Sequence, residues 1–414
     1  MTSRRRYRGR RNSGVIKTLV VLLAIICALL LLAYFVLKDF IVFDEKGITL
    51  DIPIFRESPS PPPTPEAPPE IKIEIIDTAP PLAEPEDLPA PEPLKLRAVF
   101  VPQAALLKEG AAQEYTGLCA STSINALILE MKPESGKLSY NSRLIAASGA
   151  SGQSGAAEQA ITAFNDEGIY LAAYIACFRD NTAPRNNTAL AVMHKQGVTW
   201  LDDKSSSWLN PYSPQARDYI EGLALELCDL GFKEIILDRI CFASTGQVGQ
   251  IDYGGESETP RTQIINNFLA ALRQKLSAKG VVLTCIPEPS ALIGGLDADT
   301  GQDLAMIAEN ADRIMARIPQ KDLASEFSQI EAGVSAVMEP GSLEIRFTPI
   351  VTAPKNPAAQ SSAEKMATDI GLCGASLNLG FVAYSTDGRY PAEAFAGAEA
   401  GVAETGAGQE SEAP

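Results

Sequence analysis

The sequence predicts an α/β protein with a (β/α)8 TIM barrel, preceded by one transmembrane helix and a proline-rich stalk. Eight short apolar segments recur between residues 97 and 384, and segments with helical start signals lie between them. This alternation of buried strands and helices is typical of parallel α/β folds. An uncharged run of 20 residues at 18–37 has the length of a membrane span.

The eight apolar segments are the predicted barrel strands. They lie at 97–102, 125–132, 170–178, 234–242, 281–287, 312–318, 344–351 and 376–384. Their nearly continuous apolar character suits strands that are buried on both faces, as in a parallel sheet. A doubly wound open sheet is the alternative, but no Gly-rich dinucleotide-binding motif follows any of these strands. Eight strand–helix units therefore favour the closed barrel.

Two of the predicted helices carry clear start signals. Ser213 followed by Pro214 is typical of an N-cap and first turn, and Thr259 followed by Pro260 repeats the pattern. Apolar residues then recur at helical spacing in both segments. Further helices are predicted at 155–166, 301–311, 321–331 and 358–370.

The charge near the N-terminus predicts the orientation in a membrane. The chain has a formal net charge of −16, yet all eight charged residues before Asp39 are basic. Basic residues beside a span stay in the cytoplasm. We therefore expect a cytoplasmic tip at 1–17, a transmembrane helix at 18–37, and the remaining chain outside the cell membrane. A cleaved signal peptide is the alternative, but its apolar region is usually about 7–15 residues long, and no Ala-x-Ala-like cleavage site follows this run.

Two regions of biased composition flank the predicted barrel. Residues 38–95 are rich in proline and glutamate, which favours an extended extracytoplasmic stalk. Residues 393–414 are rich in alanine, glycine and glutamate and predict a disordered tail. The barrel is therefore expected to span residues 96–392.

The composition excludes several classes of chemistry. His194 is the only histidine, so multi-histidine zinc sites and nearly all Ser-His-Asp or Cys-His schemes lack the imidazoles they need. Acid–base work falls to carboxylates. The acidic balance argues against nucleic acid as a partner. We predict no metal site and no cofactor, and we expect the cysteines of the barrel to be free buried thiols because none shows paired C-x-x-C spacing.

The predicted binding residues lie where strands end, because the active sites of (β/α)8 barrels are built at the C-terminal ends of the strands. A long connection at 181–212 adds both tryptophans of the chain, and long loops on this rim usually build substrate sites. The candidates for substrate binding are Glu130, Lys132, Arg179, Asp180, Trp200, Asp202, Trp208, Arg239, Arg317 and Tyr384. For the tryptophans, stacking on sugar rings and simple packing of the loop are equally open interpretations.

Four segments of the chain resemble one known family. They read NALILEMKPESGKLSY, YLAAYIACFRDNTAP, TWLDDKSSSWLNPYSPQARDYIEGLALELCDLGFKEIILDRICF and GQDLAMIAENADRIMARI. In this order they resemble the putative glycoside hydrolase domain of bacterial membrane-anchored proteins, first catalogued as a domain of unknown function. The resemblance implies a (β/α)8 barrel distantly related to the α-amylase clan, and a carbohydrate polymer as substrate.

The resemblance also implies two catalytic carboxyl groups. Glycosidic bond cleavage usually needs one protonated and one ionised carboxyl group. Asp238, in GFKEIILD, matches the family's strand-four aspartate and is the candidate nucleophile or base. Glu288, in CIPEP, stands near the position of the acid on strand five. The alternatives are a rim salt bridge from Asp238 to Arg239 or Lys132, and a loop glutamate with no special role.

The chain departs from the family pattern at two strand ends. Residues 239–243 read RICFA where members continue with Tyr-x-Arg-Phe-Pro, and residues 316–320 read ARIPQ where members have a Met-x-Tyr-Pro-Ser-His type sequence. Either Arg239 and Arg317 replace the missing cations, or catalysis is lost. Two functions therefore stay open: a membrane-anchored hydrolase of an envelope or extracellular polysaccharide, and a non-catalytic glycan-binding or scaffold module.

Overall fold

The computed structural model describes the barrel region and one short hairpin before it. The described residues are 41–44, 47–50 and 93–396, with gaps at 148, 153–154, 255–258, 340, 356–359 and 375–377. The chain divides into two units, Met1–Leu82 and Ala83–Pro414. The predicted tip at 1–17, the predicted span at 18–37 and most of the predicted stalk and tail lie outside the described residues. Among the described helices, none combines the length and the apolarity that a membrane span requires.

A β-hairpin stands in the first unit. Strand β1 (Ile41–Asp44) pairs antiparallel with β2 (Gly47–Leu50), and Ile41 lies opposite Leu50. The β-branched and aromatic residues of IVFD and GITL favour strands. The predicted stalk region thus begins with a hairpin, and its proline-rich part at 57–92 lies outside the described residues.

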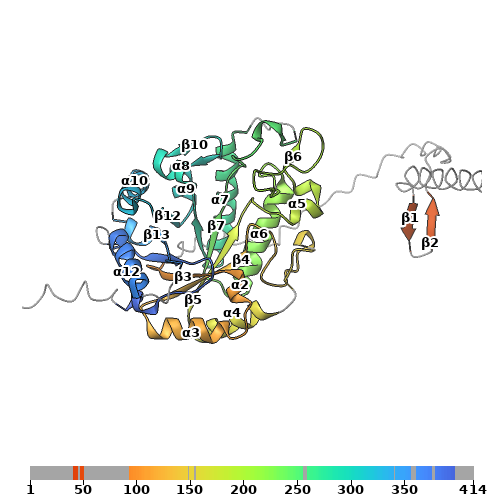
Figure 1. Cartoon of the computed structure of the whole chain (residues 1–414). Coiled ribbons are helices and arrows are strands. Elements are labelled where there is room, and N and C mark those ends of the chain that lie inside the picture. Colours follow the sequence, from red (N-terminus) through yellow and green to blue (C-terminus); the bar gives the residue numbers. More distant parts are fainter. Residues whose placement is uncertain are drawn as a thin grey trace, which may run out of the picture. The chain divides into compact units, whose positions relative to one another are not determined.

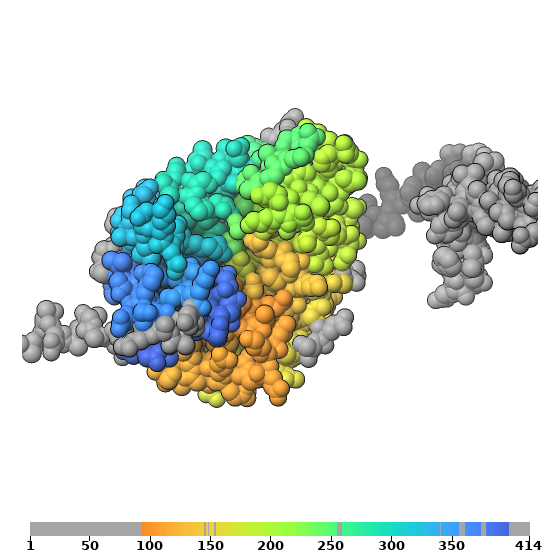
Figure 2. Space-filling model, in the orientation of Figure 1, coloured from red at the N-terminus to blue at the C-terminus, as the bar shows by residue number. Residues whose placement is uncertain are grey.

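The second unit is a closed barrel of eight parallel strands. They are β3 (Arg97–Val101), β4 (Ala126–Lys132), β5 (Tyr170–Ala176), β7 (Glu234–Asp238), β9 (Val282–Cys285), β12 (Arg313–Arg317), β13 (Phe347–Thr352) and β14 (Phe381–Tyr384). Strand β14 pairs with β3 and closes the ring (Figure 1). The space-filling view shows the first and last segments of the barrel, in orange and blue, meeting on one face (Figure 2). The predicted barrel is confirmed, and the open sheet is excluded.

Helices cover the outside of the barrel. The longer ones are α3 (Ala111–Ser121), α4 (Ala156–Asp166), α6 (Pro214–Asp229), α7 (Arg261–Ser277), α9 (Leu304–Asn310), α10 (Leu323–Ser335) and α12 (Gln360–Gly374). The shorter ones are α2 (Gln103–Leu106), α5 (Ala183–Asn186), α8 (Pro289–Gly294) and α11 (Leu343–Arg346), with 3-10 turns at Ile145–Ala147, Thr188–Leu190, Val248–Gln250 and Ala392–Phe395. Two small two-stranded sheets join β6 (Met193–His194) to β8 (Ile251–Asp252), and β10 (Leu296–Asp297) to β11 (Gln302–Asp303).

The helix starts show how local signals work. Ser213 caps α6 as predicted, because its hydroxyl oxygen accepts a hydrogen bond from the backbone N–H of Ala216 at 3.3 Å. The predicted cap at Thr259 is wrong: α7 begins at Arg261, and Pro260, which offers no side-chain acceptor, holds the N-cap position. The start of the predicted strand at 344–351 is also wrong, since residues 343–346 form α11 before β13 begins.

His194 lies in strand β6, where its Nδ1 accepts a hydrogen bond from the backbone N–H of Gln196. The predicted tail boundary at 393 falls inside a packed element, because Phe395 is fully buried and stacks on Phe381 with ring centroids 6.0 Å apart. The six cysteines of the described barrel are free, as predicted, and four of them are buried, but Cys119 and Cys228 are only half-buried.

Candidate active site

The strand register places four side chains in one layer at the mouth of the barrel. Alternate residues of each strand face the interior, and side chains in one layer of a (β/α)8 barrel come from alternate strands. Glu130 pairs in register with Tyr174, and Tyr174 with Ile236. In a barrel of shear eight, each step to the next strand advances one residue within a layer. Two steps from Glu130 reach the register position of Ile236, and the advance of two residues along β7 leads from there to Asp238.

The same counting closes the layer. Leu237 pairs with Cys285, and Cys285 pairs with Ile314. With the advance of one residue at each of these two steps, the layer passes from Asp238 to Arg317. The pairings of Arg317 with Ile350 and of Ile350 with Val382 then lead to Tyr384. The layer consists of Glu130, Asp238, Arg317 and Tyr384, which come from β4, β7, β12 and β14. All four were predicted site residues, and the barrel brings them together.

Asp238 is the most strongly bound member of this layer. Its side chain is 1% exposed. Oδ1 accepts hydrogen bonds from Arg317 Nη1 at 3.1 Å and from the backbone N–H of Arg239 at 2.8 Å. Oδ2 accepts from Arg317 Nη2 at 2.6 Å and from the hydroxyl group of Tyr174. The rim salt bridge foreseen to Arg239 or Lys132 is thus made by Arg317, with Arg239 contributing its backbone.

These donors set the protonation state of Asp238. Burial acts to raise the pKa of Asp238, but the charge and hydrogen bonds of Arg317, the charge of Arg239 and the hydrogen bond from Tyr174 together lower it below its ordinary value. The carboxylate therefore stays ionised at neutral pH. Arg317 is itself 43% exposed, so it connects the buried carboxylate to the solvent.

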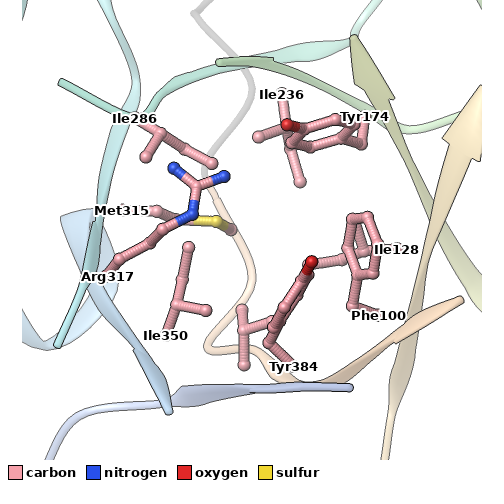
Figure 3. A pocket seen from close by; sticks show the side chains of 10 residues that line it. Phe100, Ile128, Tyr174, Ile236, Ile286, Met315, Arg317, Ile350 and Tyr384 are labelled. Carbon is pink, nitrogen blue, oxygen red and sulfur yellow. The ribbon is translucent and has the colours of Figure 1, made fainter. Parts of the chain in front are cut away.

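A small apolar cavity lies beneath this layer. It has a volume of about 20 Å³, which is room for about one water molecule. Figure 3 shows Arg317, Tyr174 and Tyr384 directed toward its centre among isoleucine, methionine and phenylalanine side chains. A sugar ring does not fit into this space, so a substrate has to lie above the layer.

A larger, polar cavity lies beside the layer, between the loops that follow β5, β7 and β9. Its volume is about 210 Å³. It is lined by Arg179, Asp202, Asp203, Lys204, Trp208, Arg239, Cys241, Ser244, Thr245 and Glu288. Predicted catalytic and binding residues thus share its wall, and its size suits a single sugar unit better than the apolar cavity does.

Glu134 holds the cations of this polar cavity in place. It forms ion pairs with Arg179 and with Arg239, the latter at 2.7 Å. Arg239 also donates from Nη1 to Glu288 Oε1 at 2.7 Å. Arg239 has φ +50°, a left-handed conformation that is uncommon for a residue with a side chain. Glu134 is not among the predicted site residues, although its place just after the end of a predicted strand is a signal that could have found it.

The two tryptophans differ in their surroundings. Trp200 is 1% exposed and donates from Nε1 to the carbonyl oxygen of Gln247 at 3.1 Å, so it packs the long loop and does not present a stacking surface. Trp208 lines the polar cavity and donates from Nε1 to Asp202 Oδ2 at 3.0 Å. Asp202 also accepts from Arg179 Nε at 2.9 Å.

Asp202 acts as the anchor of this loop. Burial acts to raise the pKa of Asp202, but hydrogen bonds from the backbone of Ser206, from Trp208 and from Arg179 lower it overall. The carboxylate is therefore held ionised and occupied by protein donors. We assign Asp202 a positioning role for Trp208 and Arg179, in place of direct substrate binding.

Lys132 and Asp180 form a buried pair outside the mouth of the barrel. Their charged groups lie 3.0 Å apart, and the two side chains are 1% and 0% exposed. Lys132 also donates to the carbonyl oxygen of Ala176 at 2.5 Å, and Asp180 Oδ1 accepts from two backbone N–H groups at the start of α5. Buried charges of this kind hold loops together. We assign this pair a structural role, in place of the predicted substrate binding.

Glu130 lies in a different environment from the other acids. It is half-buried, and its Oε2 accepts a hydrogen bond from the backbone N–H of Gln103 at 2.8 Å. Burial raises the pKa of Glu130, the hydrogen bond from Gln103 opposes this, and the charge of Glu134 adds to it. Burial likewise raises the pKa of the neighbouring Tyr384.

Across the described residues, no group of three or more histidine, cysteine or acidic side chains is placed to hold a metal ion.

Comparison with known sequences gives one family. The model of the family described as "Putative glycosyl hydrolase domain" matches residues 98–331, which is more than half of the chain. A search of curated proteins found no match.

Comparison with solved structures finds several glycoside hydrolase domains among the similar chains. The glycoside hydrolase domain of PgaB (BpsB) from Bordetella bronchiseptica is 13% identical, with a TM-score of 0.54, over 71% of this chain and 95% of that one. A hypothetical protein from Ruminiclostridium thermocellum is 28% identical, with a TM-score of 0.40, over 45% of this chain and 96% of that one. The glycoside hydrolase domain of PelA from Pseudomonas aeruginosa is 14% identical, with a TM-score of 0.40, over 71% and 96% of the two chains. The first of these likenesses supports the fold.

Proposed function

The chain belongs to the putative glycosyl hydrolase domain family, and from this premise we propose that its barrel hydrolyses glycosidic bonds in a carbohydrate polymer. Asp238 is the proposed ionised carboxylate of the reaction, acting as nucleophile or as base. Family membership supplies the reaction class, and the mouth of the barrel supplies the place where the reaction occurs.

One observation carries the proposal. Asp238 lies at the C-terminal end of β7, buried and ionised, with four hydrogen bonds that orient both of its oxygens. Hydrolysis needs one carboxylate that stays charged while a positive charge develops on the sugar ring. Arg317 covers this carboxylate. Its guanidinium group has to share the carboxylate with the substrate, or move aside, before an oxygen of Asp238 can reach the anomeric carbon or a water molecule.

The polar cavity is the proposed sugar-binding subsite. Arg179 and Arg239 are held by acidic partners, which fixes the direction of their remaining N–H groups. Trp208 adds an aromatic edge to the wall. Fixed donors beside an aromatic group are a common way to bind a sugar ring. Glu288, on the same wall, is the predicted partner carboxyl group, but its ion pair with Arg239 has to open before Glu288 can deliver a proton.

A specific observation also favours the second candidate, a non-catalytic glycan-binding or scaffold module. Both oxygens of Asp238 are fully occupied by protein donors, and the cavity beneath the layer has room for about one water molecule. A barrel whose carboxylate serves only to hold Arg317 in place would look the same. The polar cavity would then bind glycan without cleaving it.

A panel assay separates the two candidates. The full chain is incubated with soluble envelope and extracellular polysaccharides, and new reducing ends are measured alongside binding to the same glycans. The proposed hydrolase releases reducing ends from at least one glycan, at a rate proportional to protein concentration. Binding to a glycan without any release on the whole panel would instead establish the non-catalytic module.

We also propose that the chain is a single-pass protein of the cell membrane. The 20-residue apolar run at 18–37 and the basic residues before it support this orientation, with the N-terminus in the cytoplasm and the barrel outside. Protease added to intact cells then digests or releases the barrel while a tag at the N-terminus remains protected. A barrel that resists protease until the cells are lysed would contradict the proposal.

A further inference from the structure

We propose that Glu130, and not Glu288, is the proton donor to the leaving glycosidic oxygen. This inference rests on the proposed hydrolase function and names a second residue for the same reaction. The carboxyl proton of Glu130 moves to the glycosidic oxygen as the bond from the anomeric carbon to that oxygen breaks. The anomeric carbon forms a new bond to a carboxylate oxygen of Asp238, or to the oxygen of a water molecule whose proton Asp238 accepts. In the first case a water molecule then attacks the anomeric carbon, breaks its bond to Asp238 and gives a proton to Glu130. In the second case Asp238 releases its proton to solvent and Glu130 takes one up, so that each route consumes one water molecule per bond cleaved.

The first support is the position of Glu130 in the barrel. On β4, Ala126 and Ile128 belong to the interior of the barrel, while Leu127 and Leu129 belong to the core beneath the helices. The alternation therefore directs Glu130 inward at the mouth. There it shares the layer defined above, in which Asp238 is its neighbour and Arg317 lies diagonally opposite.

The second support is the spacing between β4 and β7. One strand, β5, lies between them, so the backbones are about 10 Å apart at two strand spacings. Asp238 bonds to Arg317 within the layer, and the carboxyl group of Glu130 lies beside the start of α2, where the backbone N–H of Gln103 donates to it. Inverting glycosidases separate their two carboxyl groups by about 6.5–9.5 Å, and retaining enzymes by about 5–5.5 Å. The backbone separation of about 10 Å thus leaves room for a sugar ring between the two acids at the mouth of the barrel.

The third support is the difference between Glu130 and Glu288 in their partners. Glu288 is tied to Arg239 by an ion pair at 2.7 Å. Glu130 accepts one hydrogen bond, from the backbone N–H of Gln103, and no cation of the described residues forms an ion pair with it. Burial and Glu134 also raise the pKa of Glu130, whereas the donors around Asp238 lower its pKa. Two neighbouring carboxyl groups whose environments separate their pKa values suit the acid and base roles.

The test compares Glu130→Gln with Glu288→Gln in the full chain. One substrate is the glycan identified in the panel assay. The others are α- and β-glycosyl fluorides of the same sugar, because fluoride leaves without protonation. We expect Glu130→Gln to lose about 10²- to 10⁴-fold in kcat/KM on the glycan and to keep most of its activity on a fluoride. Its pH profile should lose the fall in rate at high pH. Glu288→Gln should keep that fall and lose less than about 10-fold.

Each other outcome overturns the inference in an identifiable way. If Glu288→Gln shows the substrate-selective loss and Glu130→Gln does not, Glu288 is the donor. Equal losses on glycan and fluoride for a well-folded Glu130→Gln would mean that Glu130 only shapes the site. If the unaltered chain cleaves neither class of substrate, the proposed function itself fails. Where Glu130→Gln does not fold, Glu130→Asp replaces it: a shortened donor should be impaired on the glycan and nearly normal on the fluoride.

Discussion

Replacing Asp238 with asparagine lowers kcat/KM on the glycan by about 10³-fold or more, while the barrel stays folded. The loss is expected because asparagine cannot carry the negative charge that stabilises the sugar cation or attacks it, and single removals of such groups cost about this much. Asparagine has nearly the same volume, and its carbonyl oxygen can still accept hydrogen bonds from Arg317 or from the backbone of Arg239. Arg317 is partly exposed, so water solvates the cation that loses its partner.

The pH dependence gives a second check on Asp238. Its pKa lies below the ordinary value for aspartate, and the ionised form is the active one. The ionisation of Asp238 is therefore complete at neutral pH, and its contribution to activity is lost as the pH falls through a pKa below the ordinary value for aspartate. Rates measured from pH 3 to 9, with melting temperatures at each pH, separate this loss from acid unfolding.

A matched control removes an aspartate far from the site. Asp166→Asn changes the last residue of α4, whose side chain is exposed and makes no hydrogen bond or ion pair among the described residues. We expect unchanged kcat/KM and melting temperature for this variant. Full turnover by Asp238→Asn would exclude the proposed role of Asp238, and a lower melting temperature in Asp238→Asn alone would point to structural support instead.

Replacing Glu234 with methionine lowers the free energy of unfolding by about 3–5 kcal/mol, because it leaves Arg313 as a buried charge without its partner. The pair lies at the N-terminal end of the barrel, where Glu234 begins β7 and Arg313 begins β12, and both side chains are 0% exposed. Glu234 Oε1 accepts from Arg313 Nε at 3.1 Å and from Thr284 Oγ1 at 2.6 Å, and Oε2 accepts from the hydroxyl of Tyr170 at 3.0 Å.

The pairing is measured by a double-mutant cycle in urea. Glu234→Met and Arg313→Met are combined, and the double variant should lose at least about 1 kcal/mol less than the sum of the two single losses, because both charges are then gone. The control is Glu344→Met, which breaks a partly exposed pair with Lys95 at 3.3 Å and removes the acceptor of a hydrogen bond from the exposed Asn378; it should cost less than about 1 kcal/mol. Additive losses in the cycle would show that the two charges are not coupled.

The sequence by itself determined the barrel and the position of its central acid. All eight apolar segments predicted as strands contain barrel strands, since burial on both faces leaves a continuous apolar run that can be read without knowing the neighbours. The cap at Ser213 was equally readable, because an N-cap acts over three residues of chain. Asp238 was identified within a predicted buried strand by its match to the family's strand-four pattern.

Only the tertiary structure decided what surrounds that acid. Arg317 is 79 residues away from Asp238 along the chain, and their bond follows from the order and register of the strands. The burial of the Lys132–Asp180 pair and the assignment of Trp200 to loop packing were also invisible in the sequence. The local sequence around a charged residue at a strand end is the same whether a distant partner neutralises the charge or solvent reaches it. Long-range pairing sets that difference, and with it the contrast in environment between Glu130, Asp238 and Glu288.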